Sequence, residues 1–148
     1  MNIVNQEKFN EILNGITKND QLYIDNLVIQ EVELVNIELS NITLKICTFL
    51  NCIFRNVQFL NSNLSNNKFS QSIILESKFD NVIMSKVKFL DSEITRTDFL
   101  KSNLKKTSFV RTKFRKVDYF ASNLSEADLR WNDVSKTKFK ESGLQNAK

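Results

Sequence analysis

The chain has 148 residues, of which 41% are hydrophobic and 26% are charged, and its net charge is +4. This length and composition predict one folded, soluble domain, because disordered chains are poorer in hydrophobic residues. No apolar run approaches the ~20 residues that a membrane span needs, and the N-terminus lacks the basic start and apolar block of a signal peptide, so a cytoplasmic location is expected.

Residues 1–21 are predicted to form an N-terminal capping helix and a lead-in. Phe9, Ile12, Leu13 and Ile16 recur at helical spacing. Asn5 is placed to cap the start of a short amphipathic helix, and Gly15 is placed to cap its end. We expect this helix to close the N-terminal end of the structure that the following residues form.

From residue 22 onward the chain repeats with a period of five. Every fifth residue from Ile24 to Leu144 is large and apolar, which makes 25 sites without a change of register. A second column, two residues earlier, is aliphatic at first and mostly Ser or Thr later, and the other three positions are mostly polar. Neither a helix nor a flat strand keeps a period of five on one face. The pattern predicts a short extended segment and a tight turn in each repeat, which together form a solenoid over residues 22–148.

The aromatic residues predict the number of sides of this solenoid. In the central column they recur every ten residues, at Phe49, Phe59, Phe69, Phe79, Phe89, Phe99, Phe109 and Tyr119. In a four-sided coil, residues 20 apart lie above one another, so aromatic rings stack on two opposite faces and aliphatic side chains stack on the other two. A three-sided coil would mix the two kinds in every column. Ladders of like side chains favour the four-sided coil.

Segments such as Ser102–Lys106, Ser122–Glu126 and Ala127–Trp131 contain a small residue, then Asn or Asp, then Leu and two further residues. In this motif the chain resembles the pentapeptide-repeat proteins over about residues 22–147. The resemblance implies an all-β fold, a right-handed quadrilateral parallel β-helix of about six coils with the short capping helix at its N-terminus. Because the early repeats carry bulky aliphatic residues in the small column, the first coil is expected to be less regular.

The repeats continue close to the end of the sequence, without a second capping helix. The last central residues are Leu129, Val134, Phe139 and Leu144. Their coil would leave a strand edge and core side chains uncovered. We expect a homodimer that covers this end through the C-terminal coils, since solenoid ends need caps.

Residues suited to catalysis or metal binding are scarce. The chain has no His, so neither a Ser-His-Asp nor a Cys-His arrangement can be built. Cys47 and Cys52 fall in the small column and are expected to be buried thiols rather than metal ligands. Ser-x-x-Lys occurs at Ser85, Ser102 and Ser135, at unrelated repeat phases, and a Gly-rich phosphate loop is lacking. We expect no enzymatic activity, no cofactor and no metal site.

Basic residues concentrate in the second half of the chain. Residues 1–74 hold 5 basic and 7 acidic residues, a net charge of −2, and residues 75–148 hold 16 and 10, a net charge of +6. The second residue after each central one is mostly Asn up to Asn81, which suits a left-handed turn. From there it is mostly basic: Lys86, Arg96, Lys101, Lys106, Arg111, Lys116 and Lys136.

At the spacing of one four-sided coil, Arg96, Lys116 and Lys136 would form one basic edge, and Lys86 and Lys106 another. These edges are either a solvated face or a contact for an acidic partner or nucleic-acid phosphates. Two columns of outward apolar residues are a second candidate surface, for a protein partner. They consist of Leu60, Leu100 and Phe120, and of Leu50, Leu90 and Val110. Single outward apolar residues are otherwise ordinary.

Together these features favour a non-catalytic protein-binding or scaffold solenoid whose partner the sequence does not name. The resemblance implies an alternative, since some pentapeptide-repeat proteins resemble B-DNA in shape and charge, bind DNA gyrase and confer quinolone resistance. Such mimicry needs an acidic surface, which the net charge of +6 in the second half disfavours. A third hypothesis is nonspecific nucleic-acid binding through the basic edges, for which Phe120 and Trp131 are the obvious outward aromatic residues.

Overall fold

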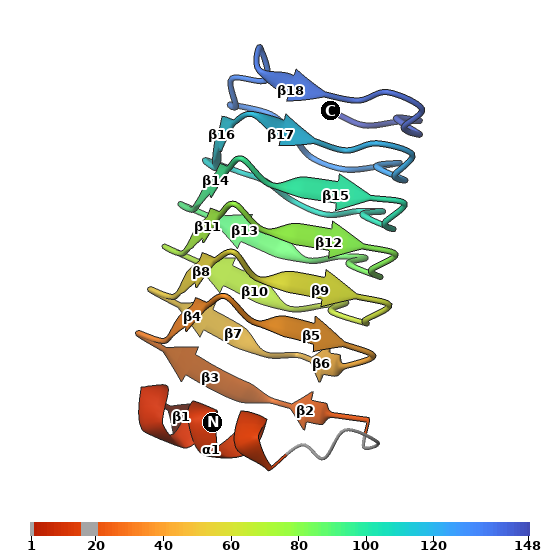
Figure 1. The fold of residues 1–148 in the computed structure, drawn as a ribbon. Coiled ribbons are helices and arrows are strands. Elements are labelled where there is room, and N and C mark those ends of the chain that lie inside the picture. Colours follow the sequence, from red (N-terminus) through yellow and green to blue (C-terminus); the bar gives the residue numbers. More distant parts are fainter. Residues whose placement is uncertain (1, 16–20) are drawn as a thin grey trace.

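The computed structural model describes residues 2–15 and 21–148. In these residues the chain forms an all-parallel β-solenoid of about six turns, with a short helix at the N-terminal end and the C-terminus at the opposite end (Figure 1). The predicted four-sided β-helix is confirmed, because the strands fall into four parallel ladders. We name each face of the rod after its first strand within the repeats.

The β3 face consists of β1 (Asn2–Val4), β3 (Leu27–Gln30), β7 (Thr48–Leu50), β10 (Lys68–Ser70) and β13 (Lys88–Leu90). The β4 face consists of β4 (Glu33–Val35), β8 (Ile53–Arg55), β11 (Ile73–Leu75), β14 (Glu93–Thr95) and β16 (Lys113–Arg115). The β5 face consists of β5 (Glu38–Ser40), β9 (Gln58–Leu60), β12 (Lys78–Asp80), β15 (Asp98–Leu100), β17 (Val117–Asp118) and β18 (Thr137–Lys138). The β2 face consists of β2 (Tyr23–Asp25) and β6 (Thr43–Lys45), continued by single bridges from Asn63 to Gly143.

Each ladder joins equivalent residues of successive coils, so that four repeats make one turn. On the β5 face, for example, Phe79 pairs in register with both Phe59 and Phe99. The central residue of each strand points inward because a strand alternates its side chains between faces. All central residues from Ile24 to Phe109 are therefore buried, and they form one continuous core along the rod. The first coil follows the same register as the others, so the expected irregularity there was wrong.

Aromatic rings stack along two opposite faces, as predicted. On the β3 face Phe89 stacks on Phe109 with ring centroids 5.1 Å apart and an interplanar angle of 3°. On the β5 face Phe79 stacks on Phe99 at 4.7 Å. Such offset stacking adds to the free energy gained from burial. Aliphatic residues dominate the other two inward columns, with Phe54 and Phe114 on the β4 face as exceptions.

The corners of the coil are made by left-handed residues. Positive φ angles occur every fifth residue from Asn26 (55°) to Trp131 (66°), and again at Glu141 and Asn146. This is the position at which the sequence predicted a turn. Most residues other than Gly and Asn avoid this region of backbone space, yet Ile46, Lys86 and Arg96 adopt it here. The turn is therefore imposed by the stacked coil rather than chosen by each residue.

Helix α1 (Gln6–Asn14) covers the N-terminal end of the rod, as predicted. The side chain of Asn5 accepts a hydrogen bond from the backbone N–H of Lys8 at 3.0 Å, and Gly15 follows the last turn. Phe9 is buried against the core. Of the four residues predicted for the apolar side of this helix, Ile16 lies outside the described residues.

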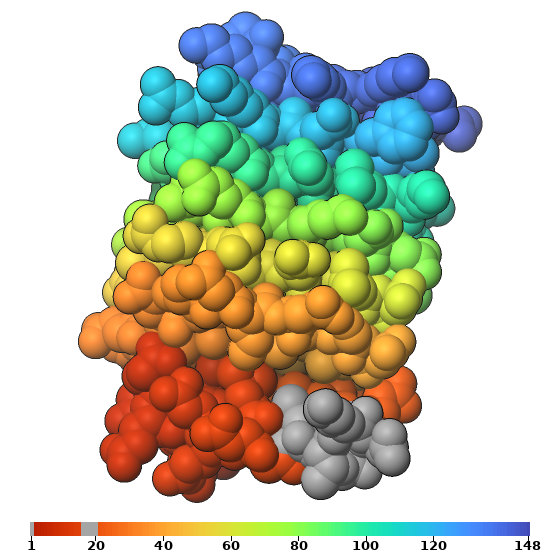
Figure 2. Space-filling model, in the orientation of Figure 1, coloured from red at the N-terminus to blue at the C-terminus, as the bar shows by residue number. Residues whose placement is uncertain are grey.

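Strand β1 was not predicted. It adds Asn2–Val4 to the end of the β3 face, where Val4 pairs with Ile29 and is buried. Val4 lies outside the periodic part of the sequence and does not keep the coil-to-coil spacing by which Ile29 pairs with Phe49, so β1 does not continue the repeat. Figure 2 shows the helix and β1 as the red segment that covers the lower end of the stacked coils.

Candidate interaction surfaces

The interior of the rod is filled, and the two thiols lie within it. Cys47 and Cys52 are buried and free, as predicted. The sulfur of Cys52 lies 3.3 Å from the carbonyl oxygen of Ile29. Burial raises the pKa of both thiols. A buried thiol with a raised pKa is a poor nucleophile, so this pair has the character of small core residues.

The small column has a second role that sequence reasoning missed. The hydroxyl of Ser102 accepts a hydrogen bond from the backbone N–H of Val82 at 3.1 Å and lies 3.1 Å from the carbonyl oxygen of Phe79. Ser72 makes the same pair of contacts lower in the rod. Buried N–H groups at these corners are therefore satisfied by the side chain of the next coil. The preference for Ser in this column was a signal of hydrogen bonding as well as of size.

Three of the seven candidate basic residues are in ion pairs with an acid of the neighbouring coil. Arg96 lies 2.6 Å from Glu76, Arg111 lies 2.6 Å from Asp91, and Lys106 lies 3.3 Å from Glu126. The hydrogen bond from Arg111 lowers the pKa of the Asp91 carboxyl. Lys105 also contacts Glu126, at 3.4 Å. The positive field of the predicted edges is therefore partly neutralised by acids of adjacent coils.

The other four candidates, Lys86, Lys101, Lys116 and Lys136, are exposed, and among the described residues none of them is in an ion pair. Lys116 and Lys136 occupy the same corner of successive coils. Lys136 departs from the other corners because it is not among the left-handed residues. The role of these side chains in binding stays a prediction.

The two outward apolar columns are interrupted and half-buried. Asp80 pairs in register with both Leu60 and Leu100, and so separates them. Ser70 separates Leu50 from Leu90 in the same way. Leu100 and Phe120 lie on successive coils, and the ammonium group of Lys140 lies 5.8 Å from the centre of the Phe120 ring. Leu90 and Val110 are likewise half-buried on successive coils. Neither column is therefore a continuous apolar surface.

Sequence reasoning missed a different set of outward apolar residues, on the β4 face. Val35 is 43% exposed and Ile73 is 39% exposed. Ile53, directly below Ile73, and Leu75 are half-buried. We call Val35, Ile53, Ile73 and Leu75 the apolar strip. The available signal was two Ile residues, one coil apart, at a repeat position that is otherwise mostly polar.

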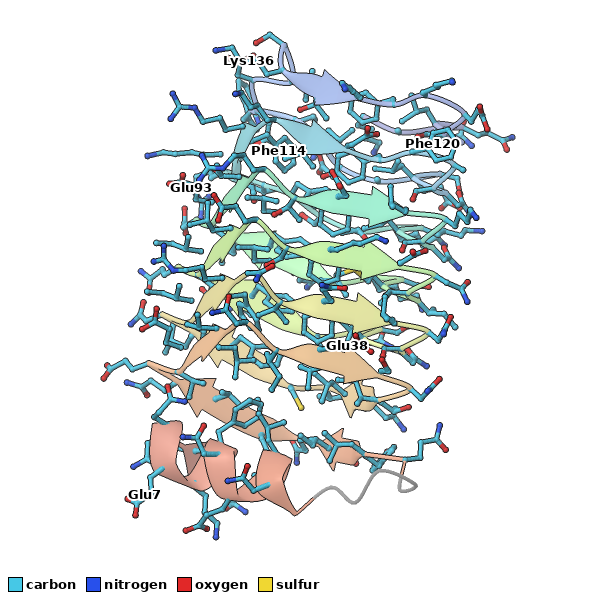
Figure 3. The ribbon with its side chains drawn as sticks, in the orientation of Figure 1. Glu7, Glu38, Glu93, Phe114, Phe120 and Lys136 are labelled. Carbon is cyan, nitrogen blue, oxygen red and sulfur yellow. The ribbon has the colours of Figure 1, made fainter. Side chains whose placement is uncertain are left out.

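Surface hollows lie along the same face. One of about 450 Å³ is lined by residues that include Ile73, Glu93, Arg111 and Lys113. A second of about 280 Å³ is lined by residues that include Glu93, Lys113, Arg115 and Lys136. In the view of Figure 3, Glu93 and Lys136 lie toward one side of the rod and Phe120 lies toward the other. Lys136 and the half-buried Phe120 thus lie on different sides of the rod (Figure 3).

The C-terminal coil exposes part of its core. Phe139 stacks on Tyr119 at 5.4 Å and is half-buried, as is Leu129. Val134 is 39% exposed and Leu144 is 42% exposed. Trp131, at the corner of the same coil, is 86% exposed. The four residues predicted for this end therefore lie together in the last coil of the described structure.

The described residues contain no cluster of three or more His, Cys, Asp or Glu side chains able to hold a metal ion. No helix within residues 2–15 and 21–148 has the length and apolar character required to cross a membrane.

Comparison with known proteins returned similar folds. No family model matches the chain, and no curated protein matches it. Among solved structures, a pentapeptide repeat protein from the thylakoid lumen of Arabidopsis thaliana is 24% identical over 61% of this chain, with a TM-score of 0.48. The aligned part is 59% of that protein's chain.

Two further structures are similar over most of the chain. Full-length QnrB1, a plasmid-mediated fluoroquinolone resistance protein, is 15% identical over 90% of this chain and 80% of its own, with a TM-score of 0.39. HetL, a pentapeptide repeat protein involved in the regulation of heterocyst differentiation in the cyanobacterium Nostoc, is 12% identical over 98% and 94%, with a TM-score of 0.29. With its period of five, its four parallel ladders and its column of small residues, the chain has the pentapeptide-repeat fold that its sequence predicted.

Proposed function

We propose that this chain is a non-catalytic scaffold that binds a protein partner through the outer faces of a rigid rod. One observation carries the proposal: the inward side chains form a continuous buried core, and the charged groups lie outside on a fixed lattice of coils. A surface that is already ordered loses little conformational entropy when it binds. Such a rod is suited to presenting side chains to a partner.

The side chains support binding better than catalysis. The thiols are buried with raised pKa values. Arg96, Arg111 and Lys106 are already engaged with acids of neighbouring coils. Acid–base catalysis needs a titrating group within hydrogen-bond reach of a substrate, whereas these pairs fix the surface itself.

The alternatives are weaker on electrostatic grounds. A DNA-mimicking gyrase-binding protein would need a predominantly acidic surface, and residues 75–148 carry a net charge of +6. Nonspecific nucleic-acid binding would need free cations along an edge. The acids Glu76 and Glu126 pair with Arg96 and Lys106 at one end of each predicted edge, and Asp91 pairs with Arg111, so part of the positive charge is already neutralised. The cytoplasmic location stays a prediction.

We further propose that a second copy of the chain covers the C-terminal coil. Val134 and Leu144 are partly exposed there, and β18 is the edge strand of the β5 face, with no further strand beside it among the described residues. A symmetric pair of rods would bury both. The dimer would lengthen the rod and leave its side faces free for a different partner.

The scaffold proposal is tested by affinity capture from the native cell, followed by titration of the purified candidate partner against the chain in a calorimeter. We expect a stoichiometric complex with a defined dissociation constant. Supercoiling and DNA-binding assays run in parallel. Inhibition of gyrase, or salt-dependent DNA binding in the absence of any protein complex, would replace the proposal with the corresponding alternative.

A further inference from the structure

The β4 face combines two kinds of surface along the axis of the rod. Its lower coils carry the apolar strip of Val35, Ile53, Ile73 and Leu75. The register places Ile53 beside Ile73 on adjacent strands, and Arg55 between Val35 and Leu75. Outward positions on a β-helix face water, so adjacent partly exposed Ile side chains leave apolar area uncovered.

The upper coils of the same face carry cations. Arg111, Lys113, Arg115 and Lys116 follow one another across a single coil, and Lys136 lies at the corner of the next coil. We call these five residues the cationic band. Arg111 is paired with Asp91. For the other four, the described residues contain no ion pair. These four side chains can therefore form ion pairs with acidic groups of a partner.

One groove joins the two parts. The hollow that contains Ile73 and the hollow that contains Lys136 share Glu93 and Lys113 as lining residues. With coils about 4.8 Å apart, the distance from the coil of Ile73 to that of Lys136 is roughly 14 Å, which an extended peptide covers with about four residues. The groove therefore has the length of a short linear segment that lies along the rod.

We propose that the β4 face binds an extended protein segment with apolar side chains at one end and acidic side chains at the other. The apolar end lies on the apolar strip and the acidic end on the cationic band. The inference rests on the proposed scaffold function and adds the face, the chemistry and the direction of the partner. Carboxylates of the segment meet Lys113, Arg115 and Lys116, and its apolar residues cover Ile73.

A nucleic acid fits this face less well than a protein segment. Its backbone is charged along its whole length, so that phosphates on the lower coils would lie over the apolar strip and near Glu33 and Glu76. A protein segment can confine its acids to the upper coils. Asp133 and Glu93 also line the hollow that contains Lys136. Their negative charges repel a uniform polyanion more than they repel a protein segment with two or three acids.

The experiment selects linear peptides from a random display library on the immobilised chain. The library peptides have about 12 residues, roughly three times the number that spans the groove in extended form. Each enriched peptide is then measured by fluorescence anisotropy. The test variants are Ile73→Lys and Arg115→Glu. The opposite β2 face offers matched controls at the same repeat positions. Ile83, which is 46% exposed, gives Ile83→Lys, and Lys45 gives Lys45→Glu.

We expect enriched peptides that carry acids toward one end and apolar residues toward the other. Their affinity should fall about tenfold or more in each β4-face variant, which corresponds to about 1.4 kcal/mol, and should stay within twofold in the controls. Unfolding curves of all four variants establish that the rod is intact.

Three outcomes would overturn the inference. The first is that no peptide is enriched. The second is that the enriched peptides bind the β4-face variants as tightly as the unaltered chain. The third is that a short single-stranded oligonucleotide displaces the peptide and its binding is weakened by Arg115→Glu but not by Ile73→Lys. The first two outcomes do not decide the scaffold proposal, which the affinity capture tests separately. A protein that is captured from the cell and still binds both β4-face variants would support a scaffold that uses a different face. The third favours nucleic-acid binding.

Discussion

Tyr119 places a hydroxyl in the core, where the other aromatic residues of its column are Phe. Its side chain is fully buried between Phe99 and Phe139, and its oxygen has no hydrogen-bond partner among the described residues. Burial raises the pKa of this phenol well above its usual range. An unsatisfied buried hydroxyl costs free energy that Phe at the same position avoids.

We therefore expect Tyr119→Phe to raise the free energy of unfolding by about 1 kcal/mol in urea denaturation. Tyr23, which is 57% exposed, provides the matched control. Tyr23→Phe should leave the unfolding midpoint nearly unchanged. A loss of stability in Tyr119→Phe would show that the hydroxyl has a partner after all.

Ile46 is a β-branched residue held at a left-handed corner, with φ of 55°. Asn26 and Asn66 occupy the same corner of the adjacent coils, and elsewhere Asn56 donates to the Asn36 side-chain oxygen at 2.8 Å. Ile46→Asn should relieve strain and raise the free energy of unfolding by about 1 kcal/mol. The reverse substitution, Asn56→Ile, should lower it. Equal midpoints for both variants would mean that the stacked coil, and not the residue, sets the energy of the corner.

At the scale of the element, the ladder of small residues explains how a corner such as the one before Val82 is stable when its backbone N–H bonds to a side chain of the next coil. Ser102 accepts from the N–H of Val82 inside the coil. Ser102→Ala should lower the free energy of unfolding by about 1–3 kcal/mol, because that buried N–H loses its acceptor. For the hydroxyl of Ser85 the described residues provide no hydrogen bond, so Ser85→Ala is the control. Similar thermal midpoints for the two variants would contradict a role for the ladder.

Two carboxylates face each other on adjacent strands of the β5 face, where Asp98 pairs in register with Asp118. Burial and then the charge of Asp118 raise the pKa of Asp98, against the opposing effects of Lys78 and Lys138. Because the folded state holds this proton more tightly than the unfolded state, protonated Asp98 contributes to the free energy of unfolding at low pH. That contribution is lost as the pH rises through the folded-state pKa of Asp98.

Asp98→Asn should therefore stabilise the chain at neutral pH and reduce its decline in stability between about pH 4 and pH 7. Urea denaturation across that range provides the measurement. Asp118→Asn removes the same repulsion and should act in the same direction. If neither variant changes the slope of stability against pH, the two carboxylates do not interact.

At the scale of the whole molecule, the proposed dimer predicts an assembly with its interface at the C-terminal coil. Sedimentation equilibrium of the chain should give the mass of two copies. Leu144→Glu should give the mass of one, because a carboxylate would be buried at the interface. Ile83→Glu, on the side of the rod, should remain a dimer. A monomer at micromolar concentrations of the unaltered chain would contradict the proposal.

The sequence by itself determined the fold almost completely. The register of five from Ile24 to Leu144, the alternation of Phe with aliphatic residues, and the cap formed by Asn5 all reappear in the structure. They were readable because a solenoid places each residue according to its number alone, through local turns and contacts between successive coils. Strand β1 was missed because it joins the β3 face from outside the repeat, without the spacing that relates one coil to the next.

The tertiary structure decided which surface charges are paired and which outward side chains are neighbours. From the sequence, Arg96 and Arg111 were candidates for binding a partner, but stacking brings Glu76 and Asp91 against them. Stacking also breaks the outward columns at Asp80 and Ser70 and gathers Val35, Ile53, Ile73 and Leu75 on one face. The inward residues are fixed by a single periodic rule. The surface depends on which side chains meet across coils, because a charge or an apolar side chain acts through its neighbours in space.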